Sequence, residues 1–164
     1  LEKTRFFESG FLERISGAGD DQRVAQLRAA TQKAVDLIIS EYERKAGKIL
    51  LVVNSYAQAL EVQQTLETAL RKANCSAHTC RMIADAINAP SGEDTVRRGE
   101  VSRFAQMNAD ILIAPAMAIE RGHNIVDEYG QYPLSAAFFM VRPMAFSDDI
   151  RQQDSVRMER DEQD

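Results

Sequence analysis

Long apolar runs and cysteines are both scarce in this chain of 164 residues. No stretch approaches the roughly 20 apolar residues that a bilayer-spanning helix needs, and no apolar signal core follows the first residues. We therefore expect no membrane partner and a cytoplasmic location. Cys75 and Cys80 are the only two cysteines. They are too few for a disulfide framework, so we expect reduced thiols that pack inside the fold.

Metal-ligand spacings and phosphate-binding glycine loops are also missing from the sequence. His78 and His123 are the only histidines, and the cysteines have neither a zinc spacing nor enough companion ligands. Neither G-x-x-x-x-G-K-[ST] nor G-x-G-x-x-G occurs, so the chain has no phosphate loop of its own. We therefore predict no metal site, and no cofactor bound by this chain alone.

The formal net charge of −5 at pH 7 argues at first against nucleic acid as a partner, because phosphate binding is supported by surplus Lys and Arg. The surplus acid is concentrated in one segment, however. Residues 148–164 hold three basic and seven acidic side chains, a net charge of −4. Residues 1–48 and 49–110 are close to neutral, at +1 and −1. The acidic balance therefore does not exclude nucleic acid from the rest of the chain.

Apolar periodicity predicts alternating helices and strands. Apolar residues recur at three- and four-residue steps from Val24 to Tyr42 and from Ala59 to Ala73, as they do on amphipathic helices. Short unbroken apolar runs, typical of strands covered on both faces, occupy 49–53, 111–114 and 135–141. A weaker strand is predicted at 77–83, a loop at 84–95, and helices within 1–20 and at 95–107. This alternation predicts a parallel sheet with helices on both faces.

Polar residues follow the first buried strand at the start of a predicted helix. In open α/β sheets, ligands bind outside the carboxyl ends of the strands. Asn54, Ser55 and Tyr56 stand there, and the free backbone N–H groups of a helix N-terminus suit a phosphate. The alternative is that Asn54 or Ser55 only caps the helix. Capping and phosphate contact are compatible, because they use different donors of the same turn.

Small residues and an Arg-Gly pair follow the second buried strand. Pro115 and Ala116 let a backbone or a ligand approach closely, and the Arg121 guanidinium stands beside Gly122, ready for an anion. The segment from Asp110 to Ile125 resembles motif V of superfamily 2 helicases, whose pattern is roughly D-I-L-V-A-T-x-x-x-x-R-G-x-D-I. The match covers the strand, the spacing, the Arg-Gly pair and the closing isoleucine.

The resemblance extends backwards from this segment. Lys48 to Tyr56 is similar to motif IV of the same family, often written K-x-L-V-F-x-x-S. Arg97 or Arg98 through Phe104 is similar to the R-x-x-x-x-x-x-F helix that precedes motif V. The ordered set covers residues 48–125 and implies the second, C-terminal RecA-like domain of a divergent helicase. Its implied fold is a three-layer α/β domain with a central, mainly parallel sheet and helices on both faces.

The resemblance also implies a division of the chain. Residues 1–47 would form an N-terminal helical segment that packs on the sheet, and residues 48–147 the RecA-like core. Residues 148–164 would be a charged tail, the truncated start of a further element. The chain begins at Leu1 and ends in a polar run, which we interpret as a piece of a longer protein.

Roles in the family can be carried over to matching positions. Asn54, Ser55, Tyr56, Pro115 and Ala116 would contact the sugar-phosphate backbone of DNA or RNA. Pro115 stands where the family usually has threonine, which removes both a hydroxyl and an N–H donor.

The remaining positions of motif V, Arg121, Gly122 and Asn124, would lie nearest the nucleotide. Asn124 replaces the usual aspartate, which keeps hydrogen-bonding capacity toward a ribose and loses the charge. This change and the proline together favour a divergent branch of the family.

Motif VI of the family, normally Q-x-x-G-R-x-G-R, supplies an arginine finger. Gln153, Arg157 and Arg160 match its spacing, and both motif glycines are missing. Arg157 and Arg160 are therefore candidate arginine fingers. The alternatives are a solvated charged helix with both arginines on one face, or a motif VI that lies beyond residue 164.

The expected function is that of the C-terminal lobe of an ATP-dependent helicase or translocase. ATP and Mg²⁺ would bind only together with an N-terminal RecA-like domain of the same protein, which is the expected partner besides DNA or RNA. The alternative from another class is a non-catalytic RecA-like docking domain, which the departures at Pro115 and Asn124 favour. A flavodoxin-like small-ligand domain is disfavoured by the Arg-Gly placement.

Overall fold

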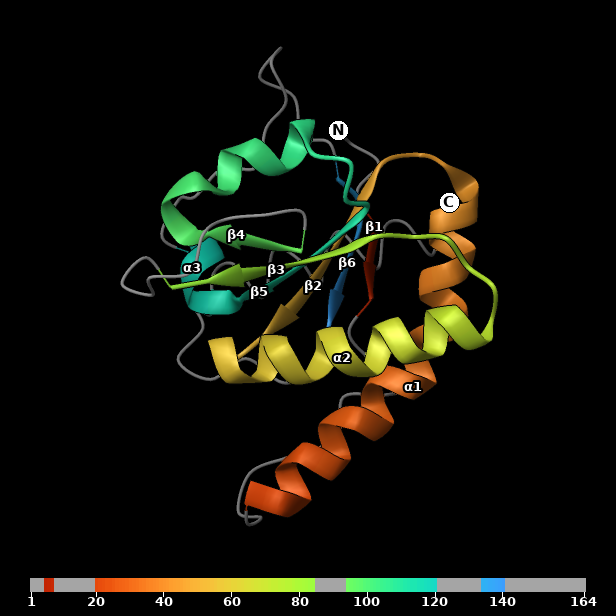
Figure 1. Cartoon of the computed structure of the whole chain (residues 1–164), viewed down its shortest axis with the longest axis vertical. Coiled ribbons are helices and arrows are strands. Elements are labelled where there is room, and N and C mark those ends of the chain that lie inside the picture. Colours follow the sequence, from red (N-terminus) through yellow and green to blue (C-terminus); the bar gives the residue numbers. More distant parts are fainter. Residues whose placement is uncertain (1–4, 8–19, 85–93, 121–133, 141–164) are drawn as a thin grey trace.

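The described part of the chain forms a six-stranded parallel sheet with helices on its faces (Figure 1). A computed structural model of the chain describes residues 5–7, 20–84, 94–120 and 134–140. The strands are β1 (Arg5–Phe7), β2 (Lys48–Val53), β3 (Thr79–Ile83), β4 (Thr95–Arg97), β5 (Ile111–Pro115) and β6 (Leu134–Phe139). They are ordered β1-β6-β2-β5-β3-β4, and every neighbouring pair is parallel. The helices are α1 (Asp20–Arg44), α2 (Tyr56–Lys72), the 3₁₀ helix η1 (Arg98–Gln106) and α3 (Ala116–Glu120).

Helices cover both faces of the sheet. The apolar sides of α1 and α2 join one buried cluster on one face, while η1 and α3 contribute Phe104 and Ala118 to a second cluster on the other. Along the central strand β2, residues 49, 51 and 53 belong to the first cluster, and residues 50 and 52 belong to the second. Successive side chains of β2 thus point to opposite faces of the sheet, and both faces are buried. This explains why the run of apolar residues in the sequence is unbroken. The architecture is the predicted three-layer α/β fold of the RecA-like type.

The two long amphipathic helices form where the periodicity predicts them. Helix α2 is followed by its C-cap, Ala73, and then by a left-handed residue, Asn74, at φ 55°. The N–H of Cys75 donates to the carbonyl of Leu70 (2.9 Å) and that of Asn74 to the carbonyl of Arg71 (3.1 Å). These two bonds form a Schellman motif, which Asn tolerates better than most residues because its short polar side chain suits the left-handed region. The motif turns the chain toward β3.

The predicted helix within residues 1–20 is wrong at Arg5–Phe7, which form β1. β1 pairs in parallel with β6, and the ring of Phe7 stacks on that of Phe138 with centroids 4.3 Å apart and an interplanar angle of 9°. The apolar spacing that predicts a helix within residues 1–20 is a local signal. The open edge of β6, which is remote in sequence, offers backbone partners that override it.

The predicted helix at 95–107 is also wrong in its first turn and in its type. Thr95–Arg97 form β4 on the edge of the sheet, with Val96 paired to Met82 and fully buried. The following residues form a 3₁₀ helix with a kink at Glu100 (φ −114°, ψ 15°). A β-branched residue beside an open strand edge gains more from pairing and burial than from a helical turn.

Within the described ranges, no helix is both long and apolar enough to cross a bilayer. The same ranges hold no group of three or more His, Cys, Asp or Glu side chains placed to hold a metal ion.

Candidate functional site

The chain leaves two neighbouring strands, β2 and β5, toward opposite faces of the sheet. From β2 it enters α2, whose buried side belongs to the first cluster. From β5 it enters α3, where Ala116 and Ala118 belong to the second cluster. Such a divergence is the topological switch point of an open α/β sheet, and ligands bind at the carboxyl ends of the strands there.

The pairing register brings the two predicted segments to this point. Val53 is paired with Pro115 at the ends of β2 and β5. Asn54 and Ala116 are therefore the next residues of the two chains beyond the sheet. Asn54, Ser55, Tyr56, Pro115 and Ala116, which sequence reasoning assigned to one interface, thus lie together at the carboxyl edge.

The turn after β2 is held by a reciprocal pair of hydrogen bonds. The backbone N–H of Gln58 donates to Ser55 Oγ (3.1 Å), and Gln58 Oε1 accepts from the backbone N–H of Asn54 (2.7 Å). Ser55 is in extended conformation (φ −153°, ψ 164°) and is the N-cap of α2. The capping alternative is therefore confirmed for Ser55. Its oxygen is used as an acceptor, which leaves the hydroxyl hydrogen to donate to a ligand.

Gln58 was missed by sequence reasoning. The signal for it is in the sequence: Ser-x-x-Gln before an apolar periodic stretch is a capping-box pattern. In this chain the glutamine carbonyl reaches the N–H one residue before the N-cap instead of that of the N-cap itself.

The other residues of the edge differ in what they present to a ligand. Tyr56 is half-buried and packs against the second cluster. The side chains of Pro115 and Ala116 are buried, so these two positions offer only backbone atoms, and proline lacks the N–H. Among the described residues, the polar side-chain groups that these segments present are therefore those of Asn54, Ser55 and Tyr56.

The other predicted site residues lie outside the described part of the chain. They are the nucleotide-binding candidates Arg121, Gly122 and Asn124 and the candidate arginine fingers Arg157 and Arg160.

Lys48, the first residue of the motif IV resemblance, lies at the opposite, amino end of β2. Its Nζ donates to the backbone carbonyl of Met107 (2.8 Å) and to that of Ala109, and lies 4.8 Å from the ring centroid of Phe104. Burial lowers the pKa of Lys48, and the nearby Asp110 carboxylate opposes that shift. The ammonium group therefore ties the turn before β5 to the sheet, remote from the candidate site.

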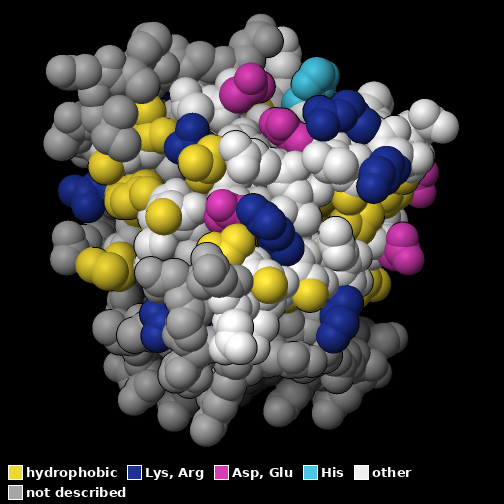
Figure 2. All heavy atoms as spheres, turned by 60° about the horizontal axis from the view of Figure 1, so that its bottom comes forward, with side chains coloured by type: hydrophobic (Ala, Val, Ile, Leu, Met, Phe, Trp, Pro, Cys, Tyr) yellow, Lys and Arg dark blue, Asp and Glu magenta, His cyan; other side chains and the backbone are white. Residues whose placement is uncertain are grey.

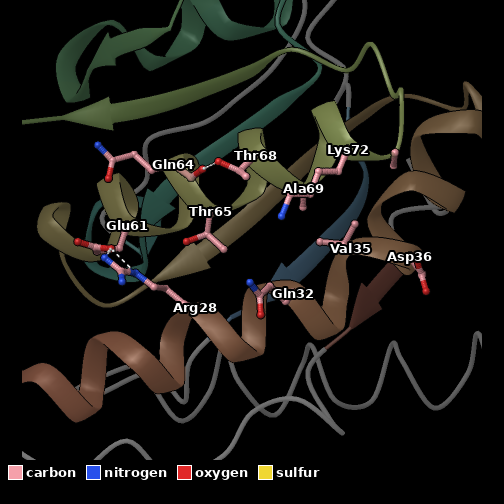
Figure 3. A pocket seen from close by; sticks show the side chains of 11 residues that line it. Arg28, Gln32, Val35, Asp36, Glu61, Gln64, Thr65, Thr68, Ala69 and Lys72 are labelled. Carbon is pink, nitrogen blue, oxygen red and sulfur yellow. Dashed lines mark hydrogen bonds and ion pairs between the residues drawn. The ribbon is translucent and has the colours of Figure 1, made fainter.

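Two hollows of the surface lie away from the switch point. A groove of about 590 Å³ runs between α1 and α2 (Figure 3), closed at one end by the Arg28–Glu61 ion pair (3.1 Å). Its charged side chains are balanced, because Asp36 and Lys72 add one charge of each sign. A second hollow of about 430 Å³ lies at the amino edge, between His78 and the turn before β5.

Among the described residues, the start of α2 at the carboxyl edge carries no charge that would repel an anion. The first turn of α2 has no acidic residue, although an acidic side chain there would stabilise the helix by about 0.3–1 kcal/mol. On the face in Figure 2, the Lys and Arg side chains of the described residues are spread singly among acidic and apolar ones. This arrangement permits a few local phosphate contacts, and that face lacks the continuous basic stripe of a high-affinity nucleic-acid protein within its described residues.

Comparison with known proteins adds no relationship to these observations. No protein-family model matches the chain, and no curated protein matches its sequence.

Proposed function

We propose that the chain is the C-terminal RecA-like lobe of an ATP-dependent nucleic-acid helicase or translocase, with the carboxyl edge of β2 and β5 as part of its nucleic-acid track. The observation that carries the proposal is the switch point. The parallel register of Val53 and Pro115 puts the strand ends within the motif IV and motif V resemblances side by side, where ligands of open α/β sheets bind.

The polar groups at this edge fit a sugar-phosphate backbone. The Ser55 oxygen already accepts a hydrogen bond from the backbone N–H of Gln58. The hydrogen of the same hydroxyl can therefore be donated to a phosphate oxygen. The side chain of Asn54 and the hydroxyl of Tyr56 add further hydrogen-bonding groups. Such contacts recognise the backbone and carry no sequence information. The track would therefore bind single strands without strong sequence preference.

The proposal requires an ATP-binding N-terminal RecA-like domain in the same protein. ATP and Mg²⁺ would lie between the two lobes, with Arg121, Gly122 and Asn124 contributing from this chain. The lobe alone would not hydrolyse ATP.

A matched pair of charge substitutions tests the nucleic-acid edge. Asn54→Asp adds a carboxylate at the carboxyl edge, and Asn108→Asp adds the same group at the exposed amino edge. Binding of a labelled single-stranded oligonucleotide at low salt is measured by fluorescence anisotropy. We expect weak binding, with Kd on the order of 10⁻⁴–10⁻⁶ M. Asn54→Asp should weaken it about tenfold, because a charge-assisted contact is worth about 1.5–3 kcal/mol, and Asn108→Asp should change it less than twofold.

Equal effects of the two substitutions would contradict the assigned edge. Thermal unfolding of both variants serves as the folding control. An aspartate beside the N-cap of α2 interacts favourably with the helix dipole, so Asn54→Asp should not lower stability.

A non-catalytic docking domain is the second candidate, and the burial of Pro115 and Ala116 favours it. Two of the five positions predicted to contact nucleic acid present no polar side chain. On this alternative the chain binds no oligonucleotide, and its parent protein shows no ATPase activity.

A further inference from the structure

A hollow of about 430 Å³ lies at the amino edge of the sheet, opposite the candidate nucleic-acid edge. Its wall comes from the turns before β3, β4 and β5 and from the end of η1. Its polar side chains are those of His78, Asp94, Arg103, Gln106 and Asn108. The volume lies in the range of about 300–1,000 Å³ that is typical of small-molecule sites.

Hydrogen bonds fix the backbone on two sides of this amino-edge hollow. Lys48 Nζ donates to the carbonyls of Met107 (2.8 Å) and Ala109, and both of these residues line the hollow. The N–H of His78 donates to Asp110 Oδ2 (2.8 Å), and the carbonyl of His78 accepts from the N–H of Asp110 (2.8 Å). The hollow is therefore preformed, which lowers the cost of binding a ligand.

Asp94 presents a carboxylate from a backbone that is also fixed. Its carbonyl accepts from the N–H of Arg81 (2.9 Å) and from Gln63 Nε2 (2.9 Å). Asp94 is exposed, and no Lys or Arg of the described ranges forms an ion pair with its carboxylate. The negative charge of the hollow is therefore open to a ligand.

Arg103 presents the opposite charge. Its Nη1 donates to Glu100 Oε2 (2.6 Å), one turn earlier on η1, which leaves other N–H groups of the guanidinium free to donate. Because Arg103 is paired with Glu100, it does not neutralise Asp94. Both charges act close to Cys80, since the Asp94 carboxylate raises the pKa of that thiol and the Arg103 guanidinium lowers it. The hollow thus carries two opposite charges that do not satisfy each other.

We propose that the amino-edge hollow binds a free α-amino acid, whose carboxylate contacts Arg103 and whose ammonium group contacts Asp94. A zwitterion is favoured because Asp94 would repel a simple anion and Arg103 would repel a simple cation. The side-chain amides of Gln106 and Asn108 offer both donors and acceptors, so they suit a ligand that carries an amide of its own. Glutamine is therefore the probe of choice. This inference does not depend on the proposed function.

Chemical-shift titration of the ¹⁵N-labelled chain with glutamine tests the site. Glutamine should shift the amides of His78, Gln106 and Asn108, with a Kd on the order of 1 mM, because both of its ion pairs are exposed. Two blocked probes each lack one charge: N-acetylglutamine has no ammonium group, and glutaminamide has no carboxylate. Each should bind about fivefold more weakly than glutamine, which is the upper end for the loss of an exposed ion pair.

Substitutions assign each charge of the ligand to one residue. Asp94→Asn should weaken glutamine binding about fivefold and leave N-acetylglutamine no weaker than before. Arg103→Met should weaken glutamine by the same factor and leave glutaminamide no weaker, while Arg103→Lys should keep most of the affinity. Matched changes of exposed residues, Asp36→Asn in the groove between α1 and α2 (Figure 3) and Arg23→Met on α1, should leave every Kd unchanged. Thermal unfolding verifies that each variant is folded.

Four results would overturn the proposal. The first is no shift of the His78, Gln106 and Asn108 amides at glutamine concentrations well above about 1 mM. The second is N-acetylglutamine binding as tightly as glutamine, which would indicate an anion site. The third is glutaminamide binding as tightly as glutamine, which would indicate a cation site. The fourth is a folded Asp94→Asn or Arg103→Met variant whose Kd for glutamine is unchanged.

Discussion

Burial changes the acidity of a single side chain, the Cys80 thiol. Cys80 of β3 is fully buried, and burial, with a smaller contribution from the Asp94 carboxylate, raises its pKa from an ordinary 9.0 to about 12. The thiol therefore stays protonated and inert at neutral pH. The sequence-based expectation that both cysteines pack inside the fold is met by Cys80, and Cys75 is half-buried against the first cluster.

This shift predicts a specific alkaline loss of stability. The folded state holds the Cys80 proton up to about pH 12, whereas the unfolded chain releases it near pH 9. The folded state then binds more protons, so the free energy of unfolding falls as pH rises from 9 toward 12. The contribution is fully present below pH 9. Urea unfolding across this range should show the fall, Cys80→Ala should reduce it, and Cys75→Ala should not. An unchanged slope in Cys80→Ala would contradict the assignment.

Among the elements, η1 is held by two buried side chains, Val101 and Phe104, of which the phenylalanine is the larger. Phe104 is fully buried in the second cluster, whereas Ser102 on the same element is exposed. Phe104→Ala should lower the free energy of unfolding by about 3–5 kcal/mol. Ser102→Ala should change it by less than about 0.5 kcal/mol. Chemical denaturation of both variants measures the difference, and similar effects of the two would show that η1 is not held by this ring.

The sequence predicts the elements that carry a periodic apolar signal of their own. Helices α1 and α2 and the strands β2, β5 and β6 belong to this class, as does the weaker β3. β1 and β4 could not be predicted in the same way, because each has three residues and forms only beside a strand that is remote in sequence. A sequence pattern reports only the periodicity of the segment itself. A short edge strand forms because of its pairing with a neighbouring strand, which that pattern does not contain.

The sequence also predicted which segments form the candidate site, but not the contacts between them. The segments at 54–56 and 115–116 could be placed because parallel strands end at one edge. Their closeness depends on the register of β2 and β5, and the role of Gln58 depends on a hydrogen bond to Asn54. Neither can be read from residue types alone. The burial of the Pro115 side chain likewise follows from the central position of β5 in the sheet.

A helicase built on the proposed lobe needs a second, ATP-binding lobe. In a polypeptide that carries both RecA-like domains, a nucleic-acid strand should stimulate ATP hydrolysis. Arg121→Ala should lower the stimulated rate about tenfold or more, because a hydrogen bond from its guanidinium to the charged nucleotide would be worth about 1.5–3 kcal/mol. Steady-state phosphate release measures the rate, and Arg23→Met is the surface control. An unchanged rate in Arg121→Ala would remove that residue from the nucleotide site.

Amide chemical-shift mapping tests directly whether the carboxyl edge of β2 and β5 holds a nucleic-acid strand. The ¹⁵N-labelled chain is titrated with a single-stranded oligonucleotide at low salt. The account predicts the largest shifts at Asn54, Ser55, Tyr56 and Ala116, with little change at Gln32 and Thr65 in the groove between α1 and α2. Shifts centred on that groove, or no shifts at a chain concentration well above 10⁻⁴ M, the weak end of typical nonspecific affinities, would contradict it.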